Sequence, residues 1–240
     1  MGGQRLLGPA ASQMPLPRTV LRHLLFAHQI GLGARVLDVG CGHGDLVHVL
    51  DDLGLEATGL DESAENVSWA KELEPRADFY IVSPSAELMW EHIGDDQPLD
   101  LIIVRHLTAY DGSLFSPLSF LATSRLLQHL CGGGSLVFLI HRETDSSEAA
   151  QTHEVACFAR HLSFFPGTCR VKHFSDCELA TRASDWLHGQ RHHGEIVMIS
   201  VQVPAEPFAA LAWKQLAVEA SGSSAATCCA WATRAAARAA

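Results

Sequence analysis

The sequence predicts an α/β domain built on a doubly wound, mostly parallel sheet with helices on both faces. Short apolar runs alternate with helical segments along the chain, an order that is typical of parallel sheets. The runs are apolar throughout instead of alternating with polar residues, as in strands that are buried on both faces. The first run ends in a glycine-rich turn at residues 40–44, Gly-Cys-Gly-His-Gly, which allows the backbone to approach a ligand closely.

The individual elements follow in chain order from the hydrophobic spacing. A first helix is expected at residues 18–30, where apolar residues recur on one side and Gly31 and Gly33 end the pattern. Strands are expected at residues 35–39, 57–60, 79–82, 99–104 and 135–140. Helices are expected at residues 45–53, 64–72, 85–91, 117–130 and 148–161. Two late strands are expected at residues 170–174 and 195–203, with a helix at residues 176–187 between them.

The composition of the chain divides it into four parts. Residues 1–17 are punctuated by glycine, proline and serine and are expected to form a flexible arm. Residues 18–204 carry the alternating pattern and form the expected folded domain. An apolar C-terminal helix is expected at residues 205–220, and residues 221–240 are an alanine-rich, low-complexity tail.

The overall composition excludes several classes of function. The 240 residues are 48% hydrophobic and 18% charged, which is typical of a globular protein. Lysine and arginine number 17 against 27 acidic residues, and the net charge of −10 argues against nucleic acid or an anionic membrane as partner. The longest aliphatic runs have the length of strands, so no membrane span is expected. Seven cysteines without a CxxC pair indicate reduced thiols and a cytoplasmic protein.

Two acidic residues lie near the glycine-rich turn in the expected fold. Asp38 precedes Gly40 by two residues, a position where a carboxylate repels a pyrophosphate but attracts an ammonium or a sulfonium group. Asp61 ends the second expected strand, about 20 residues further on, where a carboxylate can accept hydrogen bonds from ribose hydroxyls. The glycines follow the pattern GxGxG, so the third glycine comes one residue too early for the GxGxxG turn of dinucleotide sites.

Together these motifs resemble the class I S-adenosylmethionine-dependent methyltransferases, in particular those acting on small molecules. The resemblance covers residues 21–140 and implies a Rossmann-like, seven-stranded sheet with an antiparallel strand near its C-terminal edge. It implies S-adenosyl-L-methionine as cofactor and methyl transfer to O, N or C of a small-molecule or carrier-bound acceptor. The cofactor-binding residues that it implies are Asp38, Gly40, Cys41, Gly42, Gly44, Asp61, Glu62, Ser85, Ala86 and Arg105.

The sequence departs from the family pattern at two positions. After the third strand the family often has an Asp-Ala pair whose acid faces the adenine amine, and here Ser85 and Ala86 occupy these positions. The serine can still form a hydrogen bond. Before the fifth strand the family often has proline ahead of a glycine-containing turn, and here Cys131 precedes the three glycines.

The end of the fourth strand limits the type of acceptor. Its sequence, Arg105-His106-Leu-Thr, lacks the Asn/Asp-Pro-Pro-aromatic motif of the DNA amino-methylating enzymes. Arg105 has the wrong charge for the magnesium ligand of the catechol-type enzymes, so a metal-independent reaction is expected. If Arg105 faces the acceptor, its charge favours a carboxylate or a phosphate on that molecule.

Candidate residues for chemistry lie at the ends of the fourth and fifth strands. His106 is the candidate catalytic base for a hydroxyl acceptor, and it could instead only cap the sheet. Tyr110 and His141 are candidate substrate-binding residues. Three late histidines, at positions 188, 192 and 193, have no accompanying ligand set, and a solvated connection is expected there instead of a metal site.

Two alternatives to a methyltransferase stay open from the sequence. A non-catalytic protein could keep the same fold and bind the cofactor without turnover, and the unusual Ser85 favours this alternative. An NAD(P)-dependent oxidoreductase would use a similar glycine-rich turn, although with the other glycine spacing.

Overall fold

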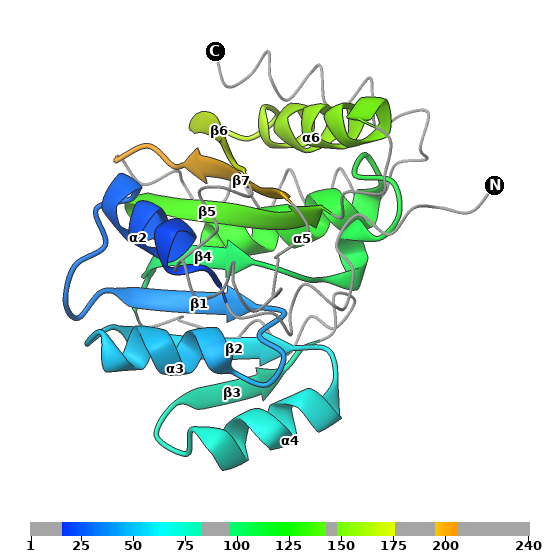
Figure 1. Ribbon diagram of the computed structural model, residues 1–240. Coiled ribbons are helices and arrows are strands. Elements are labelled where there is room, and N and C mark those ends of the chain that lie inside the picture. Colours follow the sequence, from blue (N-terminus) through cyan, green and yellow to red (C-terminus); the bar gives the residue numbers. More distant parts are fainter. Residues whose placement is uncertain (1–15, 83–96, 143–147, 176–194, 206–240) are drawn as a thin grey trace, which may run out of the picture.

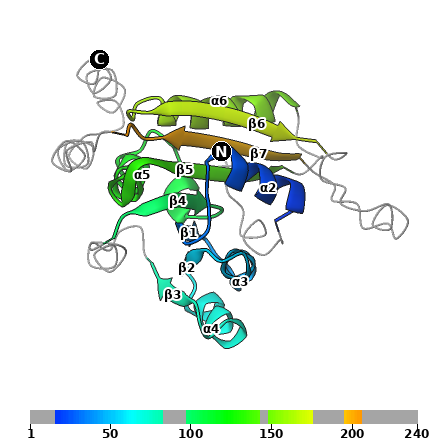
Figure 2. The ribbon, with the colours of Figure 1, turned by 90° about the vertical axis from the view of Figure 1, so that its left-hand side faces the viewer.

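The computed structural model describes residues 16–82, 97–142, 148–175 and 195–205, which form a seven-stranded sheet covered by helices on both faces (Figures 1 and 2). The strands are β1 (Arg35–Val39), β2 (Glu56–Asp61), β3 (Asp78–Ile81), β4 (Leu99–Val104), β5 (Leu130–Arg142), β6 (Thr168–Phe174) and β7 (Glu195–Gln202). Their order is β3-β2-β1-β4-β5-β7-β6, and β7 runs antiparallel to both of its neighbours. The predicted fold class, a mostly parallel sheet of seven strands with an antiparallel strand near the edge, is confirmed.

The helices divide between the two faces of the sheet. They are α2 (Arg18–Ala27), α3 (Asp45–Asp52), α4 (Ala64–Leu73), α5 (Pro117–Gln128) and α6 (Glu148–Leu162), with a short 3-10 turn, η2 (Thr108–Tyr110). α2, α3 and α4 cover one face, and α5 and α6 cover the other (Figure 2). The expected helices at residues 85–91, 176–187 and 205–220 lie outside the described residues.

The chain winds outward from the middle of the sheet in both directions. It passes from β1 to β2 and β3 on one side, and then from β4 to β5 on the other. β1 and β4 are therefore neighbours whose following helices, α3 and α5, lie on opposite faces (Figure 2). In open α/β sheets, ligands bind outside the carboxyl ends of the strands at this reversal. A ligand site is therefore expected at the segments that follow Val39 and Val104.

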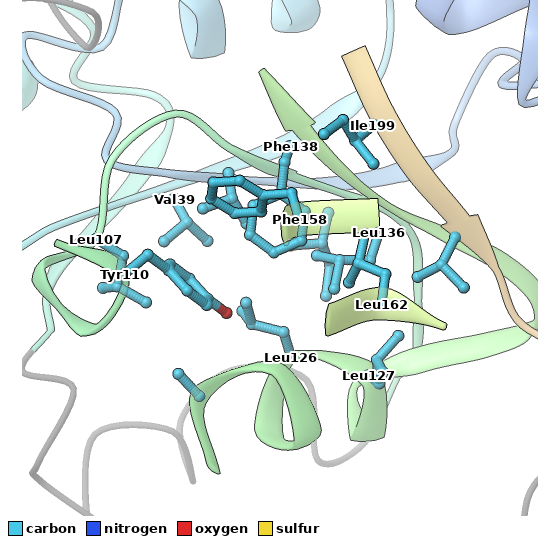
Figure 3. Close-up of a cluster of buried hydrophobic side chains, with 14 of the residues drawn as sticks. Val39, Leu107, Tyr110, Leu126, Leu127, Leu136, Phe138, Phe158, Leu162 and Ile199 are labelled. Atoms are coloured by element: carbon cyan, nitrogen blue, oxygen red, sulfur yellow. The ribbon is translucent and has the colours of Figure 1, made fainter. Parts of the chain in front are cut away.

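The strand residues supply both cores because alternate side chains point to opposite faces. On one face Leu37, Val39 and Phe138 belong to a buried cluster with α5 and α6 (Figure 3). On the other face Val36 and Val137 belong to a cluster with α2 and α3. This two-sided burial explains why central strands such as β4 and β7 are mostly apolar.

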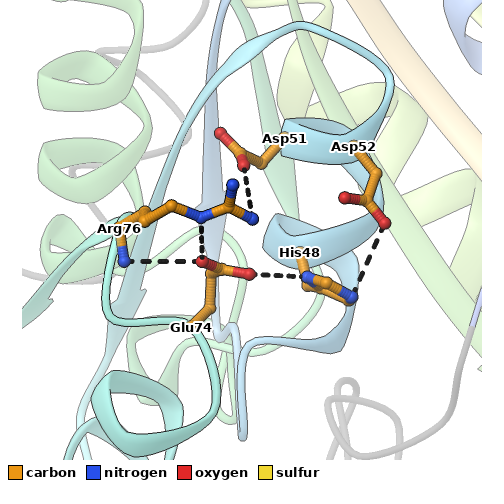
Figure 4. A network of polar contacts seen from close by, with 5 residues as sticks. All are labelled: His48, Asp51, Asp52, Glu74 and Arg76. Atoms are coloured by element: carbon orange, nitrogen blue, oxygen red, sulfur yellow. Dashed lines mark hydrogen bonds and ion pairs between the residues drawn. The ribbon is translucent and has the colours of Figure 1, made fainter.

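A polar network on the surface joins α3 to the segment after α4 (Figure 4). Glu74 accepts a hydrogen bond of 3.1 Å from Arg76 Nε, and its other oxygen lies 2.7 Å from His48 Nδ1. The hydrogen bonds from Arg76 and His48 lower the pKa of Glu74. Asp51 and Asp52 of α3 complete the network through Arg76 and His48, respectively. It holds together the two helices that follow β1 and β2.

The glycine run at residues 132–134 differs from its prediction. The sequence suggested a helix to residue 130 and then a turn, but α5 ends at Gln128 and β5 already begins at Leu130. The chain after β7 packs against this segment, because Gly133 N donates to Pro204 O and a Cβ at Gly132 would lie 2.3 Å from Ala205 O. Within β5, glycine is therefore needed at position 132 for close approach of two backbones and at position 133 for a positive φ of +83°.

Candidate functional site

The turn between β1 and α3 has a backbone that only glycine adopts readily. Gly40, Gly42 and Gly44 have φ values of +76°, +56° and +86°, all in the left-handed region. At Gly40 the space is also closed, since a Cβ would lie 2.4 Å from the carbonyl oxygen of His106. The spacing of these glycines is therefore imposed by the turn itself and by the chain after β4.

Residues of β2 fix this turn in place. The backbone N–H groups of Gly40 and Cys41 both donate to the carbonyl oxygen of Leu60, at 2.7 and 2.9 Å. Gly42 N donates to Asp61 Oδ2 at 2.9 Å. The turn and the end of β2 thus form one hydrogen-bonded unit at the carboxyl edge of the sheet.

Asp61 is nearly buried and already accepts three hydrogen bonds. Besides Gly42, its donors are Ser63 N at 2.9 Å and Asn66 Nδ2 at 3.0 Å. A carboxylate has about four acceptor positions, so roughly one of them is left for a ligand in this arrangement. Asn66 was not predicted as a site residue, although its place in the first turn of α4, after the N-cap Ser63, is a local signal for such a contact.

Arg105 crosses from β4 to β1 and pairs with Asp38. Nε donates to Oδ1 at 3.0 Å and Nη2 donates to Oδ2 at 2.6 Å. Nη2 also donates to the carbonyl oxygen of Cys41 at 2.9 Å. Burial opposes the charge on Arg105, but the carboxylate of Asp38 outweighs it and raises the pKa of Arg105. Two residues expected to face a ligand are thus bonded to each other.

Cys41 carries a neutral thiol inside the turn. Its side chain is buried, and burial raises the pKa of the thiol, as do the nearby charges of Asp38 and Asp61. A thiol in this state is a poor nucleophile. What Cys41 contributes to the turn is its backbone, whose N–H donates to Leu60 O and whose carbonyl oxygen accepts from Arg105.

Glu62 connects the end of β2 to the segment after β4. Its Oε2 accepts from Thr108 N at 2.9 Å, and its Oε1 accepts from the Thr108 hydroxyl at 2.7 Å. Because β1 lies between β2 and β4, this contact passes over the carboxyl end of β1. Thr108 could not be predicted from local sequence patterns, since its contact with Glu62 depends on the order of the strands.

The two candidate histidines lie at the same edge of the sheet. His106 is the second residue after β4 and is partly buried, and its backbone packs against Gly40. His141 is the second-last residue of β5 and is also partly buried. Since β4 and β5 are parallel, their carboxyl ends lie on the same side as the glycine turn.

Tyr110 does not line this edge, and its prediction as a substrate-binding residue is wrong. The ring is fully buried in the core, with its centroid 5.1 Å from that of Phe138 (Figure 3). The hydroxyl lies 3.0 Å from the Thr123 hydroxyl, which lies 2.8 Å from His161 Nε2. The turn η2 directs the side chain inward, where it joins α5 and α6.

The remaining predicted site residues lie outside the described part of the chain. Ser85 and Ala86, expected at the adenine, are among them, as are the histidines at 188, 192 and 193. Within the described ranges no group of three or more histidine, cysteine or acidic residues could hold a metal ion. No helix within those ranges is long and apolar enough to cross a membrane.

Comparisons with known proteins identify the family and the fold of the chain. A family model described as "Methyltransferase domain" matches residues 12–169. The fold is similar to an S-adenosylmethionine-dependent methyltransferase from Thiobacillus denitrificans in complex with S-adenosyl-L-homocysteine, at 16% identity over 83% of this chain and 94% of that chain, with a TM-score of 0.50. It is also similar to a protein described in connection with the conversion of a disulfide bond into a thioacetal group during echinomycin biosynthesis, at 17% identity over 88% and 91% of the two chains, with a TM-score of 0.54. A search of the curated proteins finds no match.

Proposed function

The chain belongs to the methyltransferase domain family and is an S-adenosylmethionine-dependent methyltransferase, and we propose that it methylates a small molecule or a carrier-bound intermediate without a metal ion. The observation that carries this proposal is the glycine turn hydrogen-bonded to Asp61 at the carboxyl edge of β1 and β2. A turn with these φ values and a neighbouring carboxylate suits a nucleoside that carries hydroxyl groups.

The residues present fit the nucleoside half of the cofactor well. Asp61 retains room for about one hydrogen bond from a ribose hydroxyl. Gly40, Gly42 and Gly44 keep the turn without side chains. Glu62 is a further candidate contact, because its side chain passes over the end of β1. These residues therefore support the proposal that the cofactor binds between β2 and the turn.

The chemistry of transfer needs little from the protein beyond alignment and a proton acceptor. When bound, S-adenosylmethionine supplies a methyl carbon on a sulfonium, whose C–S bond breaks as the acceptor forms its bond to that carbon and the sulfur keeps the electron pair. The chain has to align the acceptor and exclude water. For a hydroxyl acceptor, His106 is the proposed proton acceptor, since an imidazole is basic near neutral pH. His141 is a proposed acceptor contact.

The charge of Arg105 gives no support to an anionic acceptor. The sequence suggested a carboxylate or a phosphate on the acceptor if this residue faced it. In the structure the guanidinium is buried and bonded to Asp38, so its charge is balanced within the protein. The proposed acceptor is therefore a small molecule whose charge is not specified, in line with the acidic composition of the chain.

Isothermal titration calorimetry with S-adenosylhomocysteine and, separately, NADH tests the proposal on the purified full chain. Binding of S-adenosylhomocysteine with no heat from NADH is the expected result. Binding of NADH alone would mean that the chain does not bind the cofactor of its family, and it would contradict the proposal. Mass spectrometry of reactions with S-adenosylmethionine and a panel of hydroxyl, amine and thiol acceptors then identifies the product by its added methyl group.

A further inference from the structure

Asp38 is the acid that precedes the glycine turn, and its carboxylate is inaccessible. The side chain is 0% exposed, and that of its partner Arg105 is 4% exposed. Both carboxylate oxygens accept hydrogen bonds from the guanidinium. A ligand ammonium could reach Asp38 only if the pair separated and the turn moved.

Arg105 also holds the turn from the side of β4. Its Nη2 donates to the carbonyl oxygen of Cys41, and the same oxygen accepts from Gly44 N at 3.0 Å. The backbone N–H of Arg105 donates to Val39 O at 2.9 Å. One residue therefore joins β4 to the last residues of β1 and to the middle of the turn, while Leu60 and Asp61 accept the hydrogen bonds that hold the turn on the side of β2.

The balance of charge in this pair has a consequence for binding. A free carboxylate beside the turn would attract the ammonium of the methionine half of the cofactor. The guanidinium supplies the opposite charge at hydrogen-bonding distance, so the pair as a whole carries no net charge. A turn that is already fixed also loses less conformational freedom when a ligand binds.

We propose that Arg105 is a positioning residue for cofactor binding, and that the protein recognises the nucleoside half of the cofactor through Asp61 and the preset turn, without contact between Asp38 and the cofactor ammonium. The inference rests on the proposed function, because it assumes that S-adenosylmethionine binds at this turn. It assigns Asp38 a different role from the one that the sequence suggested, namely to hold Arg105.

Calorimetry with two ligands tests the inference. S-Adenosylhomocysteine has the amino-acid half, and 5′-methylthioadenosine lacks it while keeping adenine, ribose and sulfur. The variants are Asp38→Asn, Arg105→Gln and the paired Asp38→Asn/Arg105→Gln, with Arg76→Gln as a surface control that also loses a hydrogen bond to a carboxylate. Thermal unfolding of each variant reports whether the fold is intact.

Each single variant should bind both ligands at least about tenfold more weakly than the wild type, since it leaves one buried charge unpaired. In Asp38→Asn and in the paired variant, which both lack the carboxylate, the ratio of the two affinities should stay within about twofold of the wild-type ratio. The paired variant has no unpaired charge and should recover part of the lost affinity, the rest reflecting the lost hydrogen bond from Arg105 to Cys41 O. Arg76→Gln should match the wild type.

Three outcomes would overturn the inference. A direct contact with the ammonium predicts that Asp38→Asn loses about tenfold or more for S-adenosylhomocysteine only. Affinities within about twofold of the wild type in Arg105→Gln would remove its positioning role. If the single variants do not fold, the paired variant still lacks the Asp38 carboxylate. A loss of about tenfold in affinity for S-adenosylhomocysteine relative to 5′-methylthioadenosine in that variant would likewise contradict the inference. Absence of binding by the wild type to either ligand would instead refute the proposed function.

Discussion

Arg105 and Asp38 are 67 positions apart in the chain and form a buried, two-bond ion pair between neighbouring strands. The pair lies directly beneath the glycine turn that the sequence identified as the ligand-binding loop. Arginine donates two hydrogen bonds from a rigid planar group, which a lysine cannot reproduce. The site therefore depends on a contact that neither strand's sequence reveals alone.

Asp61→Asn should weaken binding of S-adenosylhomocysteine by about tenfold or more, because a charged acceptor is lost from both the turn and the ligand. Isothermal titration calorimetry measures this loss. Asp78→Asn is the matched control, since Asp78 is an exposed acid at the start of β3, the next strand. An Asp61→Asn protein with wild-type affinity would remove Asp61 from the ribose role.

Gly40→Ala should abolish binding and lower the free energy of unfolding by about 2 kcal/mol or more, since the new Cβ meets His106 O and the residue keeps a positive φ. Denaturant unfolding and calorimetry measure the two effects. Gly112→Ala is the control, because nothing lies within 4 Å of a Cβ at Gly112. Equal stability of the two variants would show that the turn tolerates a side chain.

Tyr110→Phe should leave S-adenosylhomocysteine affinity unchanged and lower the free energy of unfolding by about 1 kcal/mol, since it removes the hydrogen bond to Thr123 inside the core. Once an acceptor is known, its KM should also match that of the wild type. A raised KM with unchanged stability would restore Tyr110 to the acceptor site.

Stability should fall as the pH drops below about 6.5, in part because of His161. Burial lowers the pKa of this histidine from 6.5 to about 3, so the folded state keeps it neutral while the unfolded chain takes up a proton. The stabilisation is present in full above pH 6.5 and is lost as the pH falls toward 3. His28, buried beside Ser135, behaves in the same way with a pKa of about 4.

His161→Gln should reduce this pH dependence by about 1.4 kcal/mol per pH unit between pH 6 and about 4. Urea unfolding at several pH values measures the slope, and the comparison with wild type isolates the contribution of His161. An unchanged slope would mean that His161 is charged in the folded protein or does not titrate differently on unfolding.

The strands and the glycine turn were predictable because each depends on a pattern of residues that are close together in the sequence. Apolar runs such as residues 99–104 identify strands buried on both faces, and the spacing of Gly40, Gly42 and Gly44 identifies a turn with positive φ. Asp61 followed from its distance along the chain. The glycine run within β5 was misassigned because its cause, the close approach of Pro204 and Ala205, lies about 70 residues away.

The sequence by itself determined the fold class, the position of the turn and the family, since each rests on residues that are neighbours in the chain. Only the tertiary structure decided which side chains meet: Arg105 with Asp38, Glu62 with Thr108, and Tyr110 with Thr123 in the core. These contacts depend on strand order and on the direction of each side chain at the end of its strand. Local spacing does not encode either, because both follow from how the whole sheet packs against its helices.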